Sequence, residues 1–403
     1  MKILIVSQYF WPEEFRVNDI AKGLVEKGHT VEVLTGIPNY PSGKKLKGFS
    51  LLKKTHNEYE NIKVYRTPMI TRGSGSSIKL MLNYISFMIF GIFRAIPLLF
   101  KKYDKIFMFE TSPITAAVPA MFLSKVKKIE STIYVQDLWP ETFYSIVPLN
   151  NTKVKKIMDK FCMWIYNSFD KILIASKGYK EILESKNIDE KKIIYFPQWA
   201  EDFYGNTSAI EEMESEVFNI TFAGNIGKAQ DVETLVNAMN YIKSKTSESK
   251  IMCNIIGDGS NLEKLKKMVK DFNLGDNIKF LGRKPPESMP EYFSKADALV
   301  VTLGKEYILK VTLPAKVQSY MASKKPIIGC ISGEGKSVIE ESECGFAAES
   351  GDFEKLGDTI LKMSKLSKQQ LNELGENGLN YFKDNFTRTK LLNKLDSIFN
   401  YKL

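Results

Sequence analysis

Short apolar runs alternate with helical patterns along the whole chain, and this alternation constrains the fold more than any other feature. Runs rich in Val and Ile predict buried strands, and the amphipathic segments between them predict crossover helices. Such alternation is typical of parallel sheets covered by helices on both faces. The first series of runs is KILIVSQ, TVEVLTG, IKVYRTP, KIFMFE, TIYVQD, KILIAS and IIYFP, and the second is NITFAGN, IMCNIIGD, NIKFLGR, DALVVTL and KPIIGCI.

The two series predict two α/β domains, because a polar and acidic stretch at residues 199–216 separates them and has the character of a linker. We expect doubly wound, Rossmann-like domains over residues 1–198 and 217–380 that face each other across a cleft. The chain of 403 residues is long enough for both. Residues 381–403 predict a helix with no strand after it, which can pack back on either domain, including the N-terminal one. Ligands of such sheets bind beyond the carboxyl ends of the strands.

Charge is distributed unevenly between the two halves. Residues 1–200 contain 30 Lys and Arg against 18 Asp and Glu, whereas residues 201–403 contain 27 against 29. A basic first half indicates an anionic partner for that domain. No nucleic-acid module or aromatic-basic motif is present, so we expect no nucleic acid. A membrane surface or phosphorylated substrates fit better.

Histidine and cysteine usage excludes several kinds of chemistry. The only histidines are His29 and His56, which leaves no Ser-His-Asp triad and no histidine-rich metal site. The four cysteines are scattered without a CxxC pair, which predicts neither a zinc site nor a disulfide framework and fits a reducing cytoplasm. The N-terminus runs directly into a predicted strand and has no signal-peptide cleavage site.

One segment, SIKLMLNYISFMIFGIFRAIPLLF at residues 77–100, departs from the alternation. Its uncharged run from Leu80 to Phe93 is shorter than the roughly 20 residues that span a bilayer. A core helix, a helix lying on an anionic membrane and a true span are the three alternatives. The positive charge of this region favours the membrane surface, with Phe87, Ile89 and Phe90 facing lipid.

Four loops of the second half follow predicted strands and have the character of a phosphate site. FAGNIGKAQD, IIGDGSNLEKL and FLGRKPPESM supply glycines and charge, and LPAKVQSYMA predicts a helix whose first turn carries Pro314 at its first position and a lysine nearby. Together they predict a nucleotide diphosphate site. No Walker A pattern and no G-x-G-x-x-G with its downstream acid occurs, which argues against an ATPase and a nicotinamide cofactor. The candidate donor-binding residues are Gly224, Asn225, Gly227, Gln230, Gly257, Asp258, Gly259, Arg283, Pro314 and Ser319, with Lys228 and Lys316 as cations.

Loops of the first half follow strands in the same way and offer carboxylates, amides and aromatic rings, which suit a hydroxylated ligand such as a sugar. They are YFWPEEFRVNDIA, TGIPNYPSGKKLKG, ETSPITAA and YVQDLWPETF. Local turn chemistry is the competing explanation for any one of these residues. The candidate acceptor-binding residues are Glu13, Arg16, Asn18, Asn39, Tyr40, Trp139 and Glu141, beside Asp137.

Long motifs in these loops resemble the family 4 retaining glycosyltransferases of the GT-B fold. The resemblance rests on YFWPEEFRVNDIAKGLVEKGHTVEVLTGIPNYPSGK, VQDLWPE, FAGNIGKAQD and PAKVQSYMASKKPIIG and covers nearly the whole chain. More narrowly, the motifs are similar to O-antigen and capsule enzymes, including the N-acetyl-L-fucosamine transferase branch. The resemblance implies a UDP-sugar donor on the second domain and a polyprenyl-diphosphate-linked acceptor on the first. It also implies retention at the anomeric carbon and work at the inner face of the membrane.

Several positions depart from the common family pattern. The two glutamates that many relatives carry are replaced by Val311 and Ser319, an arginine by Asn225, a lysine by Gln230 and a histidine by Gln136. These changes recur in the narrower branch, which indicates a variant site.

The resulting hypothesis is a retaining enzyme that needs no metal or other cofactor. Lys228, Lys316 and helix N-termini would stabilise the departing UDP electrostatically, while Asp137 and Glu13 would orient hydroxyl groups. The missing glutamates leave open a catalytically silent sugar-nucleotide-binding partner, and a UDP-sugar epimerase of the same architecture is the third hypothesis.

Overall fold

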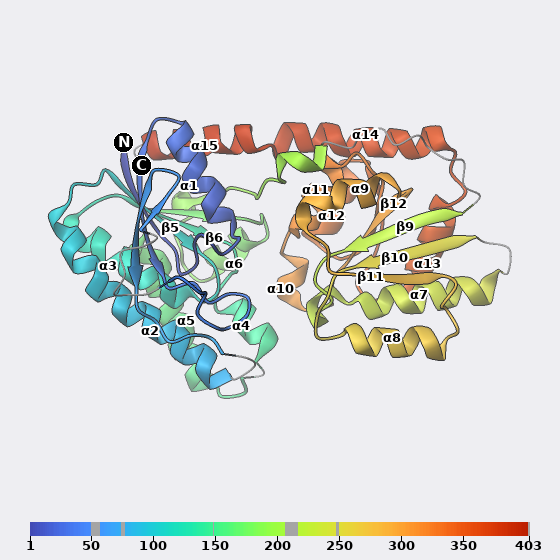
Figure 1. Ribbon diagram of the computed structural model, residues 1–403, viewed down its shortest axis with the longest axis horizontal. Coiled ribbons are helices and arrows are strands. Elements are labelled where there is room, and N and C mark those ends of the chain that lie inside the picture. Colours follow the sequence, from blue (N-terminus) through green and yellow to red (C-terminus); the bar gives the residue numbers. More distant parts are fainter. Residues whose placement is uncertain (50–56, 74–76, 148, 206–216, 247–249, 402–403) are drawn as a thin grey trace. The chain divides into compact units, whose positions relative to one another are not determined.

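The computed structural model describes residues 1–49, 57–73, 77–147, 149–205, 217–246 and 250–401 (Figure 1). The chain forms two compact units. The first unit comprises residues 1–175, 179–196 and 392–403, and the second comprises residues 176–178 and 197–391. Each unit is an α/β structure with its own sheet. His56 and residues 206–216 of the expected linker lie outside the described residues, whereas Trp199 and Ala200 are buried.

The first unit is built on an eight-stranded sheet with the order β3-β4-β2-β1-β5-β6-β7-β8. All neighbouring strands are parallel except the short β3, which pairs antiparallel with β4. In β1, Ile3, Leu4, Ile5 and Val6 are all fully buried, because helices cover both faces of the sheet. The strands are β1 (Lys2–Val6), β2 (Thr30–Gly36), β3 (Glu58–Tyr59), β4 (Ile62–Thr67), β5 (Lys105–Glu110), β6 (Ser131–Val135), β7 (Lys171–Ile174) and β8 (Ile193–Tyr195).

The helices of the first unit follow its strands, as the sequence pattern predicts. They are α1 (Arg16–Glu26), α2 (Ser77–Ala95), η1 (Ile96–Phe100), η2 (Ile114–Ala117), α3 (Val118–Lys127), α4 (Glu141–Ile146), α5 (Thr152–Ser168), α6 (Tyr179–Ser185) and η3 (Glu190–Lys192).

The second unit is built on a six-stranded parallel sheet with the order β11-β10-β9-β12-β13-β14. Its strands are β9 (Phe218–Ala223), β10 (Ile251–Ile256), β11 (Ile278–Gly282), β12 (Ala298–Thr302), β13 (Ile327–Cys330) and β14 (Gly345–Ala348). Its helices are η4 (Asp202–Gly205), η5 (Lys228–Gln230), α7 (Val232–Lys245), α8 (Leu262–Asp271), η6 (Pro286–Ser288), α9 (Met289–Ser294), α10 (Tyr307–Lys310), α11 (Ala315–Ala322), α12 (Glu334–Glu341), α13 (Phe353–Met363) and α14 (Lys368–Asn385).

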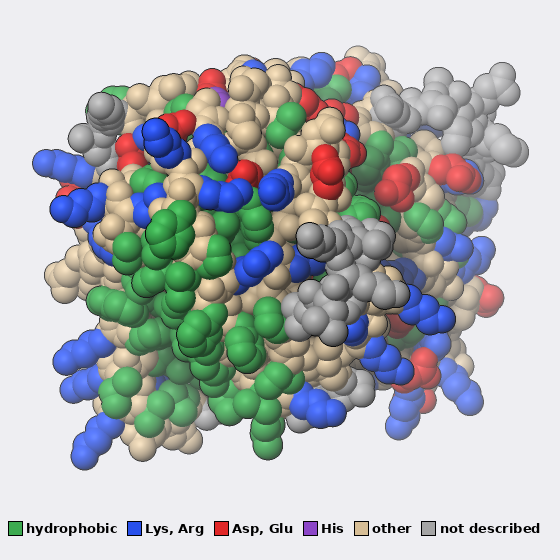
Figure 2. Space-filling model, turned by 60° about the vertical axis from the view of Figure 1, so that its left-hand side comes forward, with side chains coloured by type: hydrophobic (Ala, Val, Ile, Leu, Met, Phe, Trp, Pro, Cys, Tyr) green, Lys and Arg blue, Asp and Glu red, His purple; other side chains and the backbone are tan. Residues whose placement is uncertain are grey.

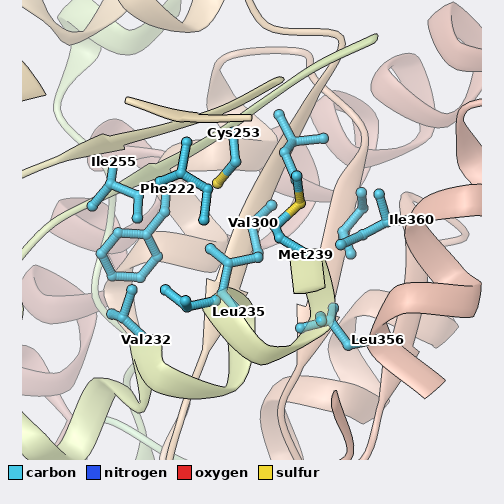
Figure 3. Close-up of a cluster of buried hydrophobic side chains, with 14 of the residues drawn as sticks. Phe222, Val232, Leu235, Met239, Cys253, Ile255, Val300, Leu356 and Ile360 are labelled. Atoms are coloured by element: carbon cyan, nitrogen blue, oxygen red, sulfur yellow. The ribbon is translucent and has the colours of Figure 1, made fainter. Parts of the chain in front are cut away.

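A large apolar core lies between this second sheet and its helices (Figure 3). Phe222 from β9 and Val300 from β12 contribute from the sheet, whereas Leu235 from α7 and Leu356 from α13 contribute from the helices, and all four are fully buried. Burial of this kind stabilises the unit by roughly 2 kcal/mol per large side chain. The core thus holds the carboxyl ends of the strands, and the loops beyond them, in fixed positions.

The last helix, α15 (Arg388–Asn400), ends in the first unit. Leu392 packs against Gly23 of α1, where an added Cβ would overlap the leucine side chain. His29 Nε2 lies 2.9 Å from Asp396 Oδ1, and the fully buried Lys171 donates a hydrogen bond of 2.6 Å to the carbonyl oxygen of Ile398. His29 is therefore part of the attachment of α15.

The predicted fold class is confirmed, because each unit contains a Rossmann-like parallel sheet flanked by helices. Every strand segment quoted from the sequence contains an observed strand. The sequence patterns did not predict β14 or the short β3.

Candidate active site

The candidate site of the second unit lies where its chain changes direction across the sheet. β9 is bordered by β10, which follows it in the chain, and by β12, which does not. The loops after β9 and β12 therefore diverge at this point, and open α/β sheets bind ligands in such a position.

Two glycine-containing loops pack closely beside this position. Gly257, at φ +143°, follows β10, and a Cβ there would overlap the carbonyl oxygen of Gly224. A Cβ at Gly259 would likewise overlap the carbonyl oxygen of Ile226. The amide of Ile226 donates a hydrogen bond of 2.8 Å to the carbonyl oxygen of Asp258. Only glycine at these two positions lets the loops after β9 and β10 lie this close together. The backbone N–H and C=O groups of both loops therefore lie side by side at the edge of the sheet.

Lys316 reaches this edge from the first turn of α11. Its Nζ is buried, lies 3.8 Å from the centroid of the Phe222 ring and has no hydrogen-bond partner among the described residues. A Cβ at Gly224 would lie 2.6 Å from this Nζ, so the glycine makes room for the lysine. Burial lowers the pKa of Lys316 to about 7. A buried cation without a counter-ion fits an anion that binds from outside.

The helix that carries Lys316 is fixed to the end of β9 one turn later. The hydroxyl of the buried Tyr320 accepts a hydrogen bond of 3.1 Å from the amide of Ala223 and lies 3.3 Å from the carbonyl oxygen of the same residue. Pro314 occupies the N-cap position, one residue before the first helical residue, Ala315, whereas the sequence pattern predicts it at the first helical position. Its side chain makes no capping hydrogen bond. The amide of Val317 donates a hydrogen bond of 3.0 Å to the carbonyl oxygen of Pro314. The preceding N–H groups, of Ala315 and Lys316, are the ones that could bind a ligand.

The other predicted donor residues border the same loops. Lys228 begins η5 and is exposed, as are Asn225, Asp258 and Arg283. The side-chain amide of Asn225 donates to Gln230 Oε1 at 3.2 Å, and the Asp258 carboxylate accepts from the amide of Gly259 at 2.7 Å.

Two further predicted residues take local roles. The Ser319 hydroxyl donates to the carbonyl oxygen of Ala315 at 3.2 Å. Gly227 is buried in the loop after β9, where a Cβ would lie 2.6 Å from the side-chain amide of Asn225.

In the first unit, the predicted residue Glu13 holds the loop after β1 to the loop after β2. Its side chain is 3% exposed, and Oε1 accepts hydrogen bonds of 2.7 Å from the amides of Asn39 and Tyr40. Burial raises the pKa of Glu13 to about 6. Asn18 accepts from the amide of Trp11 at 2.9 Å and donates to the carbonyl oxygen of Glu13 at 2.7 Å. These contacts shape the loop.

Asp137 is held in place by a short chain of hydrogen bonds at the end of β6. Its Oδ2 accepts from the Ser112 hydroxyl at 2.9 Å, and that hydroxyl accepts from the Trp139 indole N–H at 3.0 Å. Asp137 and Trp139 are both partly exposed, so the ordered carboxylate remains accessible. Glu141 forms an ion pair with Lys186, which directly follows α6, and Arg16 is the first residue of α1.

Glu110, which precedes this region at the end of β5, is fully buried. Burial and, to a lesser extent, the charge of Asp137 raise the pKa of Glu110 well above its usual range. The raised pKa favours the neutral form of this carboxyl group.

The sequence reasoning missed one cationic residue, Arg72. Its Nη1 donates a hydrogen bond of 3.2 Å to the hydroxyl of Tyr9, and its guanidinium carbon lies 5.2 Å from the centroid of the Tyr40 ring. The sequence contains one indication of Arg72: it lies in the loop that follows the predicted strand IKVYRTP, and the other candidate residues also lie in loops that follow strands. Within the described ranges, no group of three or more His, Cys, Asp or Glu could hold a metal ion.

Comparison with known proteins places this geometry in context. The family model described as Glycosyl transferases group 1 matches residues 206–381. A probable glycosyltransferase, WbjE of Pseudomonas aeruginosa, is 22% identical over 59% of this chain and 61% of its own length. The putative colanic acid biosynthesis glycosyl transferase WcaI of Escherichia coli is 22% identical over 80% of this chain and 81% of its own length. The chain thus spans about three fifths of one relative and four fifths of the other.

Among solved structures, that of Anabaena HepE in complex with UDP and glucose is similar, with a TM-score of 0.71 and 14% identity. The similarity covers 100% of both chains, which confirms the GT-B fold. Residues 206–381 are therefore similar to group 1 glycosyltransferases. The match places the group 1 glycosyltransferase domain on the unit that carries Lys316 and the glycine loops. The narrower N-acetyl-L-fucosamine branch stays a prediction, since the relatives are only distantly related.

Proposed function

We propose that this protein is a glycosyltransferase that moves a sugar from a UDP-sugar to a lipid-linked saccharide acceptor, with retention and without a metal ion. The second unit binds the donor, and the first unit binds the acceptor. The acceptor is a polyprenyl-diphosphate-linked saccharide in the assembly of a bacterial surface polysaccharide such as O-antigen or capsule. The solved HepE structure contains UDP and glucose, and WcaI is a putative colanic acid biosynthesis glycosyl transferase, which agrees with this assignment.

The observation that carries the donor site is the buried nitrogen of Lys316, which has no hydrogen-bond partner among the described residues and lies at the N-terminal end of α11. A diphosphate at this position would receive one charge-assisted hydrogen bond from Lys316 and further bonds from backbone N–H groups. Lys228 adds a second, exposed cation. The same groups would stabilise the negative charge that develops on the leaving UDP during transfer, which is electrostatic catalysis by preorganised donors. Asp137 would orient a hydroxyl group from the first unit.

The membrane is proposed as the second partner because α2 and η1 expose an apolar face. We call this set the α2–η1 face: Ile78, Met81, Leu82, Ile85, Ile89, Phe90, Phe93, Ile96 and Phe100, all at least 36% exposed. Figure 2 shows hydrophobic side chains gathered on one side of the molecule with Lys and Arg side chains around them. Apolar side chains bordered by cations are typical of helices that lie on anionic membranes.

The opposite side of α2 is packed into the first unit and contains polar residues. Asn83 is buried and donates to the carbonyl oxygen of Ile70 at 2.5 Å, and Ser86 accepts from the amide of Ile70 at 2.9 Å. Phe87 is fully buried, so the expectation that it faces lipid was wrong. Ser77–Phe100 is the one helical stretch among the described residues that is long and apolar enough to cross a membrane. Its polar contacts with the domain favour a surface position at the inner face of the plasma membrane, with the enzyme in the cytoplasm.

A two-stage experiment tests the proposed function. A panel of UDP-sugars and other nucleotide sugars is first screened for thermal stabilisation of the enzyme. The best donor is then incubated with a prenyl-diphosphate-linked saccharide, and UDP release and the anomeric configuration of the product are measured. Transfer with retention supports the proposal. Donor binding without transfer would indicate a silent binding partner, and an epimerised donor in the absence of acceptor would indicate an epimerase.

A further inference from the structure

We infer that Arg72, beside the rings of Tyr9 and Tyr40, is the binding site for the phosphate group of the lipid-linked acceptor. The inference rests on the proposed function and deepens it, because it assigns the anionic part of the acceptor to one side chain. Arg72 is not among the acceptor-binding residues that the sequence motifs predict.

The position of Arg72 is fixed by its backbone. Its amide donates to Asn39 Oδ1 at 3.0 Å, and the next amide, of Gly73, donates to the carbonyl oxygen of Gly43 at 3.0 Å. Two residues earlier, Ile70 is bonded through its amide and carbonyl groups to Ser86 and Asn83 of α2. The segment is thus tied to the loop after β2 on one side and to the membrane-facing helix on the other.

The side chain of Arg72 is a cation, and no carboxylate among the described residues lies within ion-pair distance of it. Its guanidinium carbon lies 5.9 Å from the Tyr9 ring centroid and 5.2 Å from that of Tyr40. Tyr9 is buried, whereas Tyr40 is 39% exposed, so a ligand can reach the guanidinium alongside the second ring. A planar guanidinium that is oriented by aromatic rings can donate two parallel hydrogen bonds to phosphate.

The neighbours of Arg72 fit the other parts of an amphiphilic acceptor. Burial raises the pKa of the Tyr84 phenol on α2, and the charges of Arg72 and Asp137 act on it to a lesser extent, in opposite directions. Arg72 and Asp137 therefore both lie within electrostatic range of the Tyr84 side chain. The remaining side of α2 is the α2–η1 face. An apolar chain on that face would continue into a phosphate at Arg72 and a saccharide near Asp137.

The test uses farnesyl diphosphate as a probe that combines a diphosphate with an apolar chain, and farnesol as the same chain without charge. We expect Arg72→Gln to weaken binding of farnesyl diphosphate by roughly ten- to a hundredfold, as for the loss of a hydrogen bond between charged groups, and to leave farnesol binding unchanged. Arg72→Lys should restore only part of the affinity, because lysine keeps the charge but loses the planar pair of donors.

Arg94→Gln is the matched control, because Arg94 is also an arginine of the first unit whose guanidinium lies over a tyrosine ring, 5.6 Å from the centroid of Tyr65. An equal loss in both glutamine variants would overturn the assignment and indicate general electrostatics. Loss of binding to vesicles of anionic lipid in Arg72→Gln, parallel to its loss of farnesyl diphosphate, would also overturn it, because Arg72 would then bind lipid headgroups generally. Unchanged melting temperatures establish that each variant is folded.

Failure of the Arg72 assignment can be distinguished from failure of the proposed function. UDP-sugar binding belongs to the second unit, so it should be equal in the enzyme and in Arg72→Gln. With the true acceptor, the variant should show a raised KM for the acceptor and an unchanged KM for the donor. Absence of donor binding or transfer in the unaltered enzyme would refute the proposed function, whereas an unchanged acceptor KM in an active variant would refute only the role of Arg72.

Discussion

The side-chain nitrogen of Lys316 lies 3.8 Å from the centroid of the Phe222 ring, in a space that exists because residue 224 is glycine. Removing this nitrogen from water favours its neutral form, and the described residues supply no carboxylate to oppose that effect. The arrangement destabilises the empty enzyme near neutral pH and prepares it for an anion.

The stability cost of Lys316 should depend on pH in a defined direction. Its pKa is about 7 in the folded chain and 10.5 when unfolded, so between these values the unfolded chain binds more protons and stability rises with pH. We expect Lys316→Met to be more stable than the unaltered enzyme at pH 7. The difference should shrink by about 2–3 kcal/mol between pH 7 and pH 9, measured by urea unfolding. A pH-independent difference would mean that the nitrogen is solvated.

Loss of Lys316 should also lower catalysis. We expect Lys316→Ala to reduce kcat by roughly 10²–10³-fold, equivalent to about 3–4 kcal/mol, because one preorganised donor to the leaving diphosphate is removed. Lys324→Ala is the control at the other end of α11, since Lys324 is exposed and forms a surface ion pair with Glu376. Similar rates in the two variants would place the diphosphate elsewhere.

Chelation should not affect the enzyme. Because lysines and backbone N–H groups are proposed to neutralise the diphosphate, we expect full transfer activity in EDTA. The measurement is the rate of UDP release before and after exhaustive dialysis against the chelator. Activity that disappears and returns with Mg²⁺ or Mn²⁺ would refute the metal-independent mechanism.

Close approach of the two glycine loops should make Gly257 intolerant of a side chain. In Gly257→Ala, the methyl group meets the carbonyl oxygen of Gly224, and φ +143° is itself strained for alanine. We expect a loss of at least about 2 kcal/mol in the free energy of unfolding. Gly275→Ala is the control, because a Cβ there has no neighbour within 4 Å. Equal stability of the two variants would contradict the packing of the loops.

The membrane proposal predicts which substitutions release the protein from vesicles. Ile89→Ser combined with Phe93→Ser should reduce co-sedimentation with vesicles that contain anionic lipid by at least tenfold, because two side chains of the α2–η1 face lose apolar area. Tyr307→Ser in the second unit is the control, since Tyr307 is 62% exposed and Phe93 is 63% exposed. Unaltered binding in the double variant would leave the face without a role at the membrane.

The strands could be predicted from sequence because strands buried on both faces need continuous apolar runs, as in Ile3 to Val6. The orientation of α2 could not be fully predicted. The sequence is compatible with a core helix, a helix on a membrane surface and a span, and it does not show which residues of α2 face the unit. Asn83 and Ser86 find hydrogen-bond partners inside the unit, Phe87 is buried against expectation, and most of the other apolar residues remain outside.

The candidate site, too, could be predicted only in part from sequence, because part of it depends on contacts between distant segments. Glycine-containing loops after strands predict where Gly224, Gly257 and Lys316 gather. The burial of the Lys316 nitrogen depends on how α11 is held to β9 through Tyr320, which no local pattern encodes. Arg72 could not be identified from sequence because its side chain lies against Tyr9 and Tyr40, which are distant from it in the chain.

The return of residues 392–403 to the first unit means that the second unit is, along the chain, an insertion within the first. Lys171 illustrates the consequence, because its buried ammonium bonds to the carbonyl oxygen of Ile398 near the C-terminus. A chimaera that exchanges donor specificity between two such enzymes therefore needs two junctions, near residues 197 and 391. A single crossover would give the recipient a foreign final helix against Gly23 and Lys171, and its incompatibility would be mistaken for a failure of the donor site.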